Sequence, residues 1–368
     1  MPAGDWSFRW AATDGTQYDI PCIDERKISF KLNQAGSCEL KVPLRTDLGR
    51  YIATGVGWGY ILAYKGTTLR MVLETVSTDV GPASSEGIPS IAIVGTESAY
   101  QRAAGVILSP NSPYRFPTSS GQIGTALKSL INANPSWGIR DAAAGPTTTS
   151  VAPSLFDQGI SLLSLIQAWA FRGSGFDFRF DPYFAVDSSF QQVGKFEAAT
   201  VIGTTRSSAV FEFGSDTRAN LTNYSWKRLG GEHLANAVYV PSNGSSTGNS
   251  AGTVAAADVT SFATYGLRGA WITADFEEAS LRTTLAQEHL LYRKAPRRVL
   301  SLTPYPDMGA GNVPAPLVDY GIGDIVPVKI TDAGVNIVNG NVRVYGLDFT
   351  IDKDGKEAVE IQTSPETA

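Results

Sequence analysis

Segments with the pattern of β-strands dominate both ends of this 368-residue chain, and they constrain its fold more than any other feature. In residues 6–101, apolar and polar residues alternate, or β-branched residues follow one another, between short groups of turn residues, and this is the pattern of strands. Lys65-Gly66 separates two such segments, because glycine supplies the left-handed backbone that a tight hairpin turn needs. The sequence therefore predicts a β-barrel or closed sheet here.

The middle of the chain has a different pattern. Residues 105–120 contain three prolines and are expected to form an extended loop. Apolar residues then recur at helical spacing in 121–134 and again in 161–173, which predicts two short helices, each with one apolar face. Phenylalanine alternates in 176–180, the pattern of a strand, and Asp181-Pro182 is expected to start a turn. This part is therefore predicted to be an α/β insertion.

Strands are predicted again from Ala209 onward, together with one long helix. Residues 243–257 are small and polar, and they are expected to form a mobile loop between two strands. The strongest helical pattern of the chain covers Phe276–Lys294, where Asp275 can cap the first turn and Pro296 ends the helix. Its apolar positions approximate one face, and they are Phe276, Ala279, Leu285, Leu290 and Leu291.

Together these patterns predict a β-rich α+β protein with two β-barrel-like domains and an α/β insertion between them. The expected boundaries are 1–104 for the N-terminal β-barrel-like domain, 105–208 for the α/β middle domain, and 209–368 for the second β domain with one long helix. Strands and helices do not alternate as they do in the βαβ units of nucleotide-binding domains. That class of protein is therefore not expected.

Composition indicates a folded protein with few charges. Apolar residues make up 43% of the chain and charged residues 18%, against about 25% charged residues in a typical soluble domain. Such a composition suits a protein that is packed against neighbours, and it suits a loop-rich β protein equally well. The net charge of −5 argues against sequence-independent nucleic-acid binding, which needs a basic face. No signal-peptide or membrane-spanning pattern is present, so we expect folding in the cytoplasm.

Candidate metal ligands are few, and no metal site is predicted. The only histidines, His233 and His289, are far apart and match no metal motif. Cys22 and Cys38 are expected to be small buried apolar residues, with a disulfide between them as the alternative. Asp352–Gly355 resembles the start of a calcium loop, but a hairpin turn is expected because no glutamate stands at the twelfth position.

Catalytic residues are not predicted either. No serine lies in a nucleophile-elbow motif, and two histidines leave little material for a hydrolase triad. Glu277-Glu278 falls in the first turn of the predicted long helix, where the exposed backbone N–H groups favour carboxylates without any catalytic role. We therefore expect no enzyme activity, no catalytic or cofactor-binding residue, and no cofactor.

Aromatic residues are frequent along the expected strand edges. Some of them should lie in the core, and others should lie at contacts between subunits, where tyrosine and tryptophan contribute much of the binding energy. The sequence does not separate the two groups, which together comprise Trp58, Tyr60, Tyr114, Phe116, Tyr265, Trp271 and Tyr320.

Several short motifs resemble one protein family. Near the N-terminus these are the alternating segments Lys27–Asn33 and Gly36–Leu40. The others are the element Tyr265–Arg268 before the long helix, the pair Gly323-Asp324, and the last hairpin, Val344–Gly355. Together they resemble the minor tail proteins of siphophages that form the tail-tip, or baseplate, hub. The residues that carry this resemblance are Tyr265, Gly266, Leu267, Arg268, Gly323, Asp324, Tyr345 and Gly346.

The resemblance implies a structural role in a bacteriophage tail. Proteins of this family are similar in fold to the baseplate hub of contractile phages. Three copies would form a ring that joins the tail tube and the distal tail protein to the host-recognition or tail-fibre apparatus. The expected partners are further copies of the chain, the distal tail protein, the tape-measure protein and other minor tail proteins, without sequence-specific nucleic-acid binding.

The same resemblance implies that the protein is made and assembled in the host cytoplasm and located in the virion. Many hub proteins continue into a peptidase or fibre domain, whereas this sequence ends at Ala368. We therefore expect any activity that degrades the cell wall to belong to another chain.

Two alternatives remain open. Within the same tail, the chain could be the distal tail protein, which forms a ring of six copies; the α/β insertion favours the hub. From a different class, it could be a β-rich carbohydrate-binding module or a glycoside hydrolase. A hydrolase would bring carboxylates with raised pKa values together in one cleft.

Overall fold

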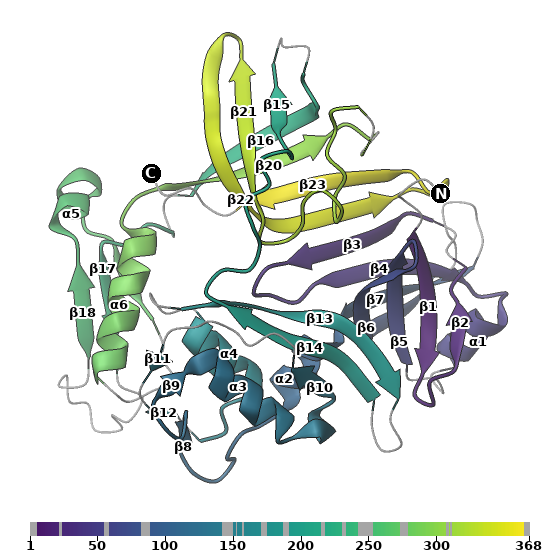
Figure 1. Ribbon diagram of the computed structural model, residues 1–368, viewed down its shortest axis with the longest axis horizontal. Coiled ribbons are helices and arrows are strands. Elements are labelled where there is room, and N and C mark those ends of the chain that lie inside the picture. Colours follow the sequence, from purple (N-terminus) through teal and green to yellow (C-terminus); the bar gives the residue numbers. More distant parts are fainter. Residues whose placement is uncertain are drawn as a thin grey trace.

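The computed structural model contains mostly β-strands, arranged in four parts that Figure 1 shows from the front. A C-terminal barrel lies above an N-terminal barrel, a middle part with helices lies at the bottom, and a small lobe projects to the left. The structure describes the chain apart from residues 1–5, 22–23, 55–58, 82–88, 142–149, 152, 157, 171–174, 187–190, 215–217, 230–232, 242–252, 273–278, 307–308, 310 and 364–368.

The N-terminal barrel is a strongly curved antiparallel sheet in which the strands lie in the order β3-β4-β7-β6-β5-β1-β2. Gly66 adopts a φ of +60° between β5 and β6, which confirms the predicted hairpin turn. The interior is apolar because alternate residues of each strand point inward. Its elements are β1 (Trp6–Ala12), β2 (Gln17–Asp19), β3 (Arg26–Lys31), β4 (Ser37–Pro43), α1 (Asp47–Ala53), β5 (Gly59–Lys65), β6 (Thr68–Gly81) and β7 (Ser90–Glu97).

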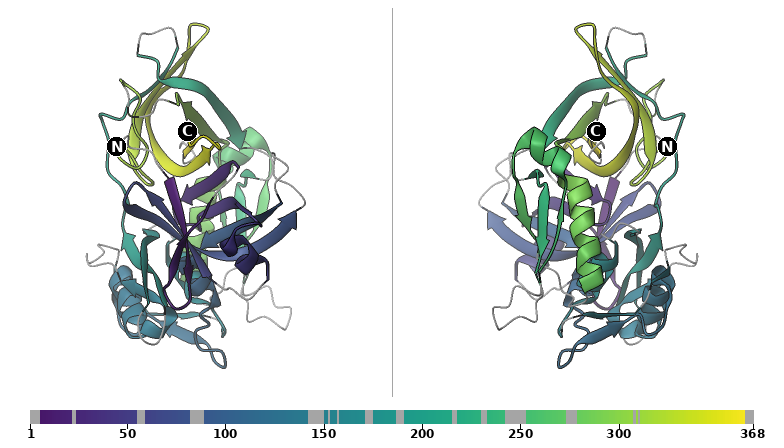
Figure 2. Two further views of the ribbon diagram at one scale, coloured as in Figure 1. Left: turned by 90° about the vertical axis from the view of Figure 1, so that its right-hand side faces the viewer. Right: turned by 90° about the vertical axis from the view of Figure 1, so that its left-hand side faces the viewer.

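The C-terminal barrel is built from six strands that curve around a common centre, as Figure 2 shows. The turn between its last two strands is the predicted hairpin, since the Asp352 carboxylate accepts hydrogen bonds from the backbone N–H groups of Asp354 and Lys356. The strands are β15 (Phe211–Phe213), β16 (Leu221–Leu229), β20 (Arg297–Pro304), β21 (Ile325–Asp332), β22 (Val335–Ile351) and β23 (Glu357–Thr363).

Strand β22 joins the two barrels. Its first half pairs with β21, and its second half pairs with β23 on one side and with β3 on the other. Leu347, for example, lies opposite Ile361 and opposite Phe30. A single 13-stranded sheet therefore runs through both barrels, and one apolar cluster contains residues from both ends of the chain.

The middle part packs three helices and a three-stranded sheet against the N-terminal barrel. The predicted helices are confirmed, with Ile123, Leu127 and Ile131 on the buried face of α3. The elements are α2 (Ser98–Gly105), β8 (Tyr114–Phe116), β9 (Gly121–Gln122), α3 (Ile123–Asn132), a 3-10 turn (Pro135–Trp137), β10 (Ile139–Asp141), β11 (Ser150–Val151), β12 (Ser154–Phe156), α4 (Leu162–Ala170), β13 (Asp177–Val186) and β14 (Gln191–Ala199).

The turn predicted at Asp181-Pro182 is wrong. Strand β13 continues through both residues, and its register with β14 shifts only between Pro182 and Ala185. Proline is tolerated there because β13 lies at the edge of its sheet, where the missing N–H breaks no ladder hydrogen bond. The alternation in 176–180 is confirmed as a strand pattern, and the side chains of Phe176, Phe178 and Phe180 are all buried.

The small lobe is a three-stranded sheet in the order β18-β17-β19, covered on one face by a long helix. Its elements are β17 (Ala237–Val240), β18 (Val254–Ala257), α5 (Val259–Tyr265), β19 (Gly269–Trp271) and α6 (Ala279–Arg293). The mobile loop predicted for 243–257 is therefore wrong at its end, where β18 pairs with β17; residues 242–252 lie outside the described part.

Helix α6 is present as predicted, but its buried face differs. Leu291 is 59% exposed, whereas Arg282, Ala286 and Glu288 are buried. Leu285 and Leu290 pack partly against the core, and Phe276 lies outside the described residues. The helix packs on a small sheet that consists largely of alanines and valines. Only a short stripe of the helix surface is therefore buried against the sheet, and polar residues occupy part of that stripe.

Candidate functional site at the junction of the three segments

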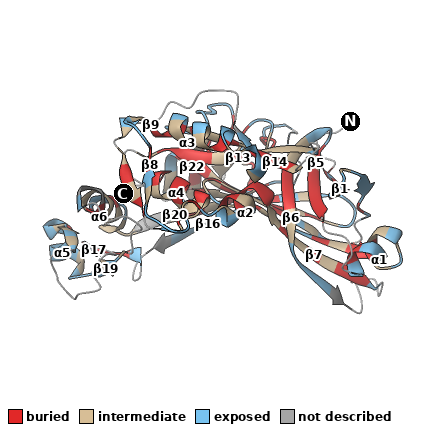
Figure 3. Ribbon diagram, turned by 90° about the horizontal axis from the view of Figure 1, so that it is seen from below, coloured by how far each residue is buried: buried red, intermediate tan, exposed pale blue. Residues whose placement is uncertain are grey.

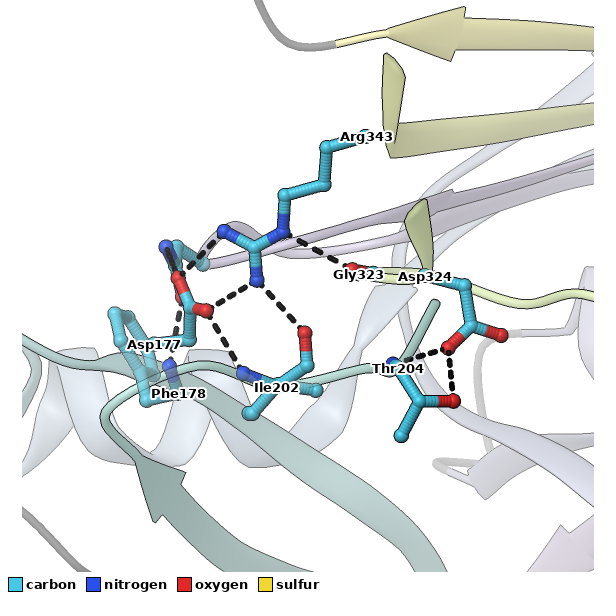
Figure 4. A network of polar contacts seen from close by, with 8 residues as sticks. Asp177, Phe178, Ile202, Thr204, Gly323, Asp324 and Arg343 are labelled. Carbon is cyan, nitrogen blue, oxygen red and sulfur yellow. Dashed lines mark hydrogen bonds and ion pairs between the residues drawn. The ribbon is translucent and has the colours of Figure 1, made fainter. Parts of the chain in front are cut away.

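A network of polar contacts lies where the three predicted domains meet, and Figure 4 shows it from close by. We call it the junction. It contains Asn33 from the N-terminal segment, Asp177 and residues 202–206 from the middle segment, and Gly323, Asp324 and Arg343 from the C-terminal segment. These residues are far apart in the sequence, so the junction exists only in the folded chain.

The ion pair between Asp177 and Arg343 forms the centre of the junction. Both guanidinium Nη atoms of Arg343 donate to the carboxylate of Asp177, and its Nε atom donates to the carbonyl of Gly323 at 3.0 Å. Nη2 also donates to the carbonyl of Ile202 at 2.7 Å. Each of the three guanidinium nitrogens therefore has an acceptor, which compensates the partial burial of this charge.

The other side of Asp177 is bound by the N-terminal segment and by the backbone of its own segment. Its carboxylate accepts hydrogen bonds from the side-chain amide of Asn33 at 3.2 Å and from the backbone N–H of Ile202 at 2.8 Å. The side-chain carbonyl of Asn33 in turn accepts from the backbone N–H of Phe178 at 2.7 Å. One buried carboxylate thus holds all three segments together.

Asp324 forms the second half of the junction. It is 5% exposed, and its carboxylate accepts from the backbone N–H groups of Thr204 at 2.7 Å and Gly321 at 2.9 Å. The guanidinium Nε of Arg206 donates to the same carboxylate at 3.0 Å. Asp324 therefore fixes the end of the middle segment to the loop before β21.

Two glycines pack against each other between these carboxylates. Gly203 and Gly323 have φ angles of +96° and +89°, a conformation that favours glycine. A Cβ atom on Gly323 would lie closer than 3.0 Å to the backbone of Ile202, and one on Gly203 would lie as close to the backbone of Gly323. The close approach of the two backbones is therefore possible only for glycine.

The structure places Gly323-Asp324 next to Tyr345-Gly346. The N–H of Gly323 donates to the carbonyl of Val344 at 2.8 Å, and the N–H of Val344 donates to the carbonyl of Asp324 at 2.8 Å. Beside this pair, the Tyr345 hydroxyl accepts a hydrogen bond from Gln34, and Gly346 faces Gln362. Four of the eight motif residues thus lie in or beside the junction.

The motif Tyr265–Arg268 lies elsewhere, in the lobe. The side chain of Asn236 donates to the carbonyl of Gly266 at 2.7 Å and accepts from the N–H of Arg268 at 2.8 Å, so it fixes the turn after α5. Leu267 is 67% exposed. The structure does not bring this motif to the junction.

Most junction residues were not identified from the sequence. They include Asn33 as a hydrogen-bond partner of a carboxylate, Asp177, Arg343, and Thr204 and Arg206. Asp177 stands among alternating phenylalanines, and its neighbours Phe176 and Phe178 are both buried. A charged residue inside a buried strand is a usable signal, because such a charge needs a partner. Nothing in the sequence pattern identifies Arg343 as that partner.

A pocket of about 420 Å³ opens beside the junction, and we call it the junction pocket. Glu97, at the end of β7, lies in its wall. Burial, followed by the nearby Asp181 carboxylate, raises the pKa of Glu97 to about 8, although a hydrogen bond from the backbone N–H of Gly36 opposes the shift. At neutral pH this carboxyl is mainly protonated. Two buried tyrosines, Tyr100 and Tyr320, also line the pocket.

No group of three or more histidine, cysteine, aspartate or glutamate side chains in the described part of the chain could hold a metal ion. Cys38 is buried as expected, and Cys22 lies outside the described residues. Among the described helices, none is long and apolar enough to cross a membrane.

The structure divides the aromatic residues that the sequence left unassigned. Tyr60, Phe116 and Tyr320 are buried in the core, whereas Trp271 on β19 is 65% exposed. Tyr114 and Tyr265 are partly buried, and Trp58 lies outside the described residues.

Comparison with known proteins identifies the fold. No family model matches the sequence, and a search of curated proteins finds no match. The chain is similar in structure to a tail protein of prophage MuSo2 from Shewanella oneidensis, with a TM-score of 0.61 and 12% identity, over 97% of each chain.

Two further solved structures agree. A tail protein from Neisseria meningitidis has a TM-score of 0.56 and 12% identity, over 98% of this chain and 97% of that one. The prophage tail protein gp18 from Listeria monocytogenes has a TM-score of 0.50 and 12% identity, over 99% and 95% of the two chains. The chain therefore has the fold of phage tail proteins along nearly its whole length. The predicted β-rich fold class is confirmed.

Proposed function

We propose that this protein is a structural component of a bacteriophage tail tip. It forms a trimeric hub ring that joins the tail tube and the distal tail protein to the host-recognition or tail-fibre apparatus. The observation that supports the proposal most directly is the match to phage tail proteins over at least 97% of this chain and at least 95% of each of theirs. A match of that extent covers the whole architecture rather than one shared domain.

The contacts within the chain suit a structural part that has to resist mechanical force. Strand β22 places backbone hydrogen bonds between both barrels, and the junction ties the middle segment to them through buried carboxylates. The division into 1–104, 105–208 and 209–368 then describes three units that work as one piece. The proposed partners are other copies of the chain, the distal tail protein, the tape-measure protein and other minor tail proteins, all within the virion.

The lobe supplies a candidate contact between copies. Val259, Phe262, Leu267 and Trp271 are each at least 49% exposed there, and Figure 3 shows α5 and β19 mainly in the colour of exposed residues. Exposed apolar side chains gathered on one part of a surface mark interaction sites. Ring interfaces are heterologous, so this surface would meet a different surface of the next copy.

Electron microscopy of assembled tails tests the proposal. We expect three copies arranged around the tail axis, below the tube and in contact with the distal tail ring. Six copies in the ring would assign the chain to the distal tail protein instead. Absence of the chain from the tail would refute a structural role altogether.

A parallel assay addresses enzyme activity. We expect no turnover of peptidoglycan or glycans by the purified chain. Turnover that a single aspartate or glutamate substitution abolishes would favour the glycoside hydrolase alternative.

A further inference from the structure

The two barrels meet along β3 and β22, and the apolar pattern of these strands does not determine which residues lie opposite each other. The strands come from opposite ends of the chain, so no hairpin turn sets their register. Ile28, for example, lies opposite Phe349. After a shift of two residues it would lie opposite Ile351, which is also apolar and on the same face of β22. Phe30 would likewise exchange Leu347 for Phe349. Another feature must therefore select the observed register.

A buried ion pair connects the two barrels near one end of these strands. The ammonium of Lys65, on β5 of the N-terminal barrel, lies 2.9 Å from the carboxylate of Glu357, on β23 of the C-terminal barrel. The two side chains are only 6% and 9% exposed. The same ammonium lies 5.5 Å from the ring centroid of Trp6 and 5.1 Å from that of Phe349, which are cation–π distances. Lys65 therefore contacts the C-terminal barrel through two groups, in surroundings largely closed to water.

A change of register would break this contact. A shift of two residues displaces one barrel along the other by about 6.6 Å, which separates Lys65 from Glu357 and from Phe349. Separating a buried charge from its partner is costly, because the protein interior does not replace the lost interaction with water. The hydroxyl of Ser29 donates to Asp348 at 2.5 Å across the same strands, but this contact is only partly buried. Water can replace it at a smaller cost.

We propose that the ion pair of Lys65 and Glu357 positions the C-terminal barrel on the N-terminal barrel, by excluding registers of β3 and β22 that the apolar pattern would accept. Asn33, which follows β3 at its other end, binds the middle segment instead. The role of the pair is specificity rather than stability, because apolar side chains of similar volume often replace a buried ion pair without loss of stability. The inference does not depend on how many copies of the chain a tail contains.

Thermal unfolding at pH 7 is the first measurement. Lys65→Met and Glu357→Gln should each lower the melting temperature by about 5 °C or more, because one charge stays buried without its counter-charge. The double variant Lys65→Met/Glu357→Met should melt within about 2 °C of the natural chain, since it leaves neither charge behind. The matched control is Asp47→Asn/Arg50→Met, which removes an ion pair whose side chains are mostly exposed, and it should leave the melting temperature unchanged.

Disulfide trapping in the full chain is the second measurement, and it reports the register itself. Ser29 lies opposite Asp348, so Ser29→Cys/Asp348→Cys cross-links the observed register. Ser29→Cys/Thr350→Cys places the cysteines opposite each other only after a shift of two residues. Mass spectrometry of proteolytic fragments after oxidation gives the yield of each cross-link and distinguishes both from products of the natural cysteines.

The observed register should dominate in the natural background and in the exposed-pair control. When Lys65→Met/Glu357→Met is added, the yield of the shifted cross-link relative to the observed one should rise by about tenfold or more. The same ratio in all three backgrounds would overturn the positioning role. A Lys65→Met/Glu357→Met variant that melts as low as the single variants, or that does not fold, would also overturn it, because the pair would then be a stabilising contact. Unchanged melting of both single variants would contradict the burial of the two charges.

Discussion

At the level of single residues, the junction depends on glycine for two separate reasons, and two substitutions distinguish them. Gly323 and Gly334 both have positive φ angles, +89° and +78°. A Cβ atom on Gly323 would clash with the backbone of Ile202, whereas a Cβ atom on Gly334 would meet nothing within 4 Å. Gly334 therefore reports the conformational cost alone.

We expect Gly334→Ala to lower the free energy of unfolding by about 1–2 kcal/mol, the cost of a left-handed alanine. Gly323→Ala should lower it by about 2 kcal/mol more, because the backbones must also separate. Urea unfolding followed by circular dichroism measures both. Equal losses for the two variants would mean that the close approach of Gly203 and Gly323 contributes nothing.

Glu97 should make stability depend on pH. Its pKa is about 8 in the folded chain against an ordinary value of 4.5 for a glutamate carboxyl. Between these values the folded chain holds one proton more than the unfolded chain, so stability is highest below pH 4.5 and falls as pH rises toward 8. We expect this group to account for a loss of about 1–4 kcal/mol between pH 5 and pH 8.5.

Glu97→Gln should remove that loss, because the amide does not titrate and its oxygen can still accept from Gly36. The free energy of unfolding of the natural chain and the variant, measured across the pH range, should converge at low pH and separate at high pH. Glu39→Gln, at an exposed position of β4, controls for the loss of one carboxylate. Parallel pH profiles for Glu97→Gln and the natural chain would contradict the expectation.

At the level of elements, sequence patterns predicted those with a regular buried face. Helix α3 was predicted because Ile123, Leu127 and Ile131 recur at the helical period, and all three are buried. Strand β18 was missed because small polar and alanine residues give no alternation, so only its pairing with β17 defines it. The continuation of β13 through Pro182 depends on its position at a sheet edge, which no local pattern contains.

The same reasoning explains what could be predicted of the junction. The pair Gly323-Asp324 was noted as a motif, but its contacts with Thr204 and Arg206 come from a distant segment. Asp177 and Arg343 lie 166 positions apart. Hydrophobic periodicity reports which face of an element is buried, and it carries no information about such polar pairs.

The helical pattern predicts that Leu165 and Leu291 both lie on a buried helix face, but the two should differ in their contribution to stability. Leu165 in α4 is fully buried, whereas Leu291 in α6 is 59% exposed. We expect Leu165→Ala to cost about 2–5 kcal/mol, because it leaves a cavity. Leu291→Ala should change stability by less than about 0.5 kcal/mol. Denaturant midpoints at an unchanged slope measure both, and a large loss for Leu291→Ala would restore the original assignment of the buried face.

At the level of the whole molecule, β22 joins the N-terminal and the C-terminal barrel in one continuous sheet. A 17-residue strand spans about 56 Å at 3.3 Å per residue, long enough to pair with β21 over one half and with β3 and β23 over the other. The N-terminal and C-terminal barrels are thereby connected through backbone hydrogen bonds. Movement of one barrel relative to the other would have to break several of these bonds together.

If the chain forms a ring, an exposed aromatic residue and a buried one should respond differently to substitution. Trp271 lies exposed on the lobe beside Tyr239, with the ring centroids 6.4 Å apart, whereas Tyr60 is buried in the N-terminal barrel. We expect Trp271→Ser to leave the melting temperature of the monomer nearly unchanged and to reduce incorporation into tails strongly, because aromatic anchors contribute much of an interface's energy. Tyr60→Ser should instead lower the melting temperature and reduce incorporation only through misfolding.

Melting curves of the purified variants and the copy number per tail in electron micrographs measure the two effects separately. Normal incorporation of Trp271→Ser into tails would show that the lobe does not take part in the ring contacts. The hub proposal itself would then still be tested by the number of copies per tail, which we expect to be three. A lower melting temperature for Trp271→Ser would show that this side chain stabilises the monomer, and its assembly defect would then carry no information about the interface. Obligate rings bury large apolar contacts, so a true contact residue should reduce assembly without affecting the fold.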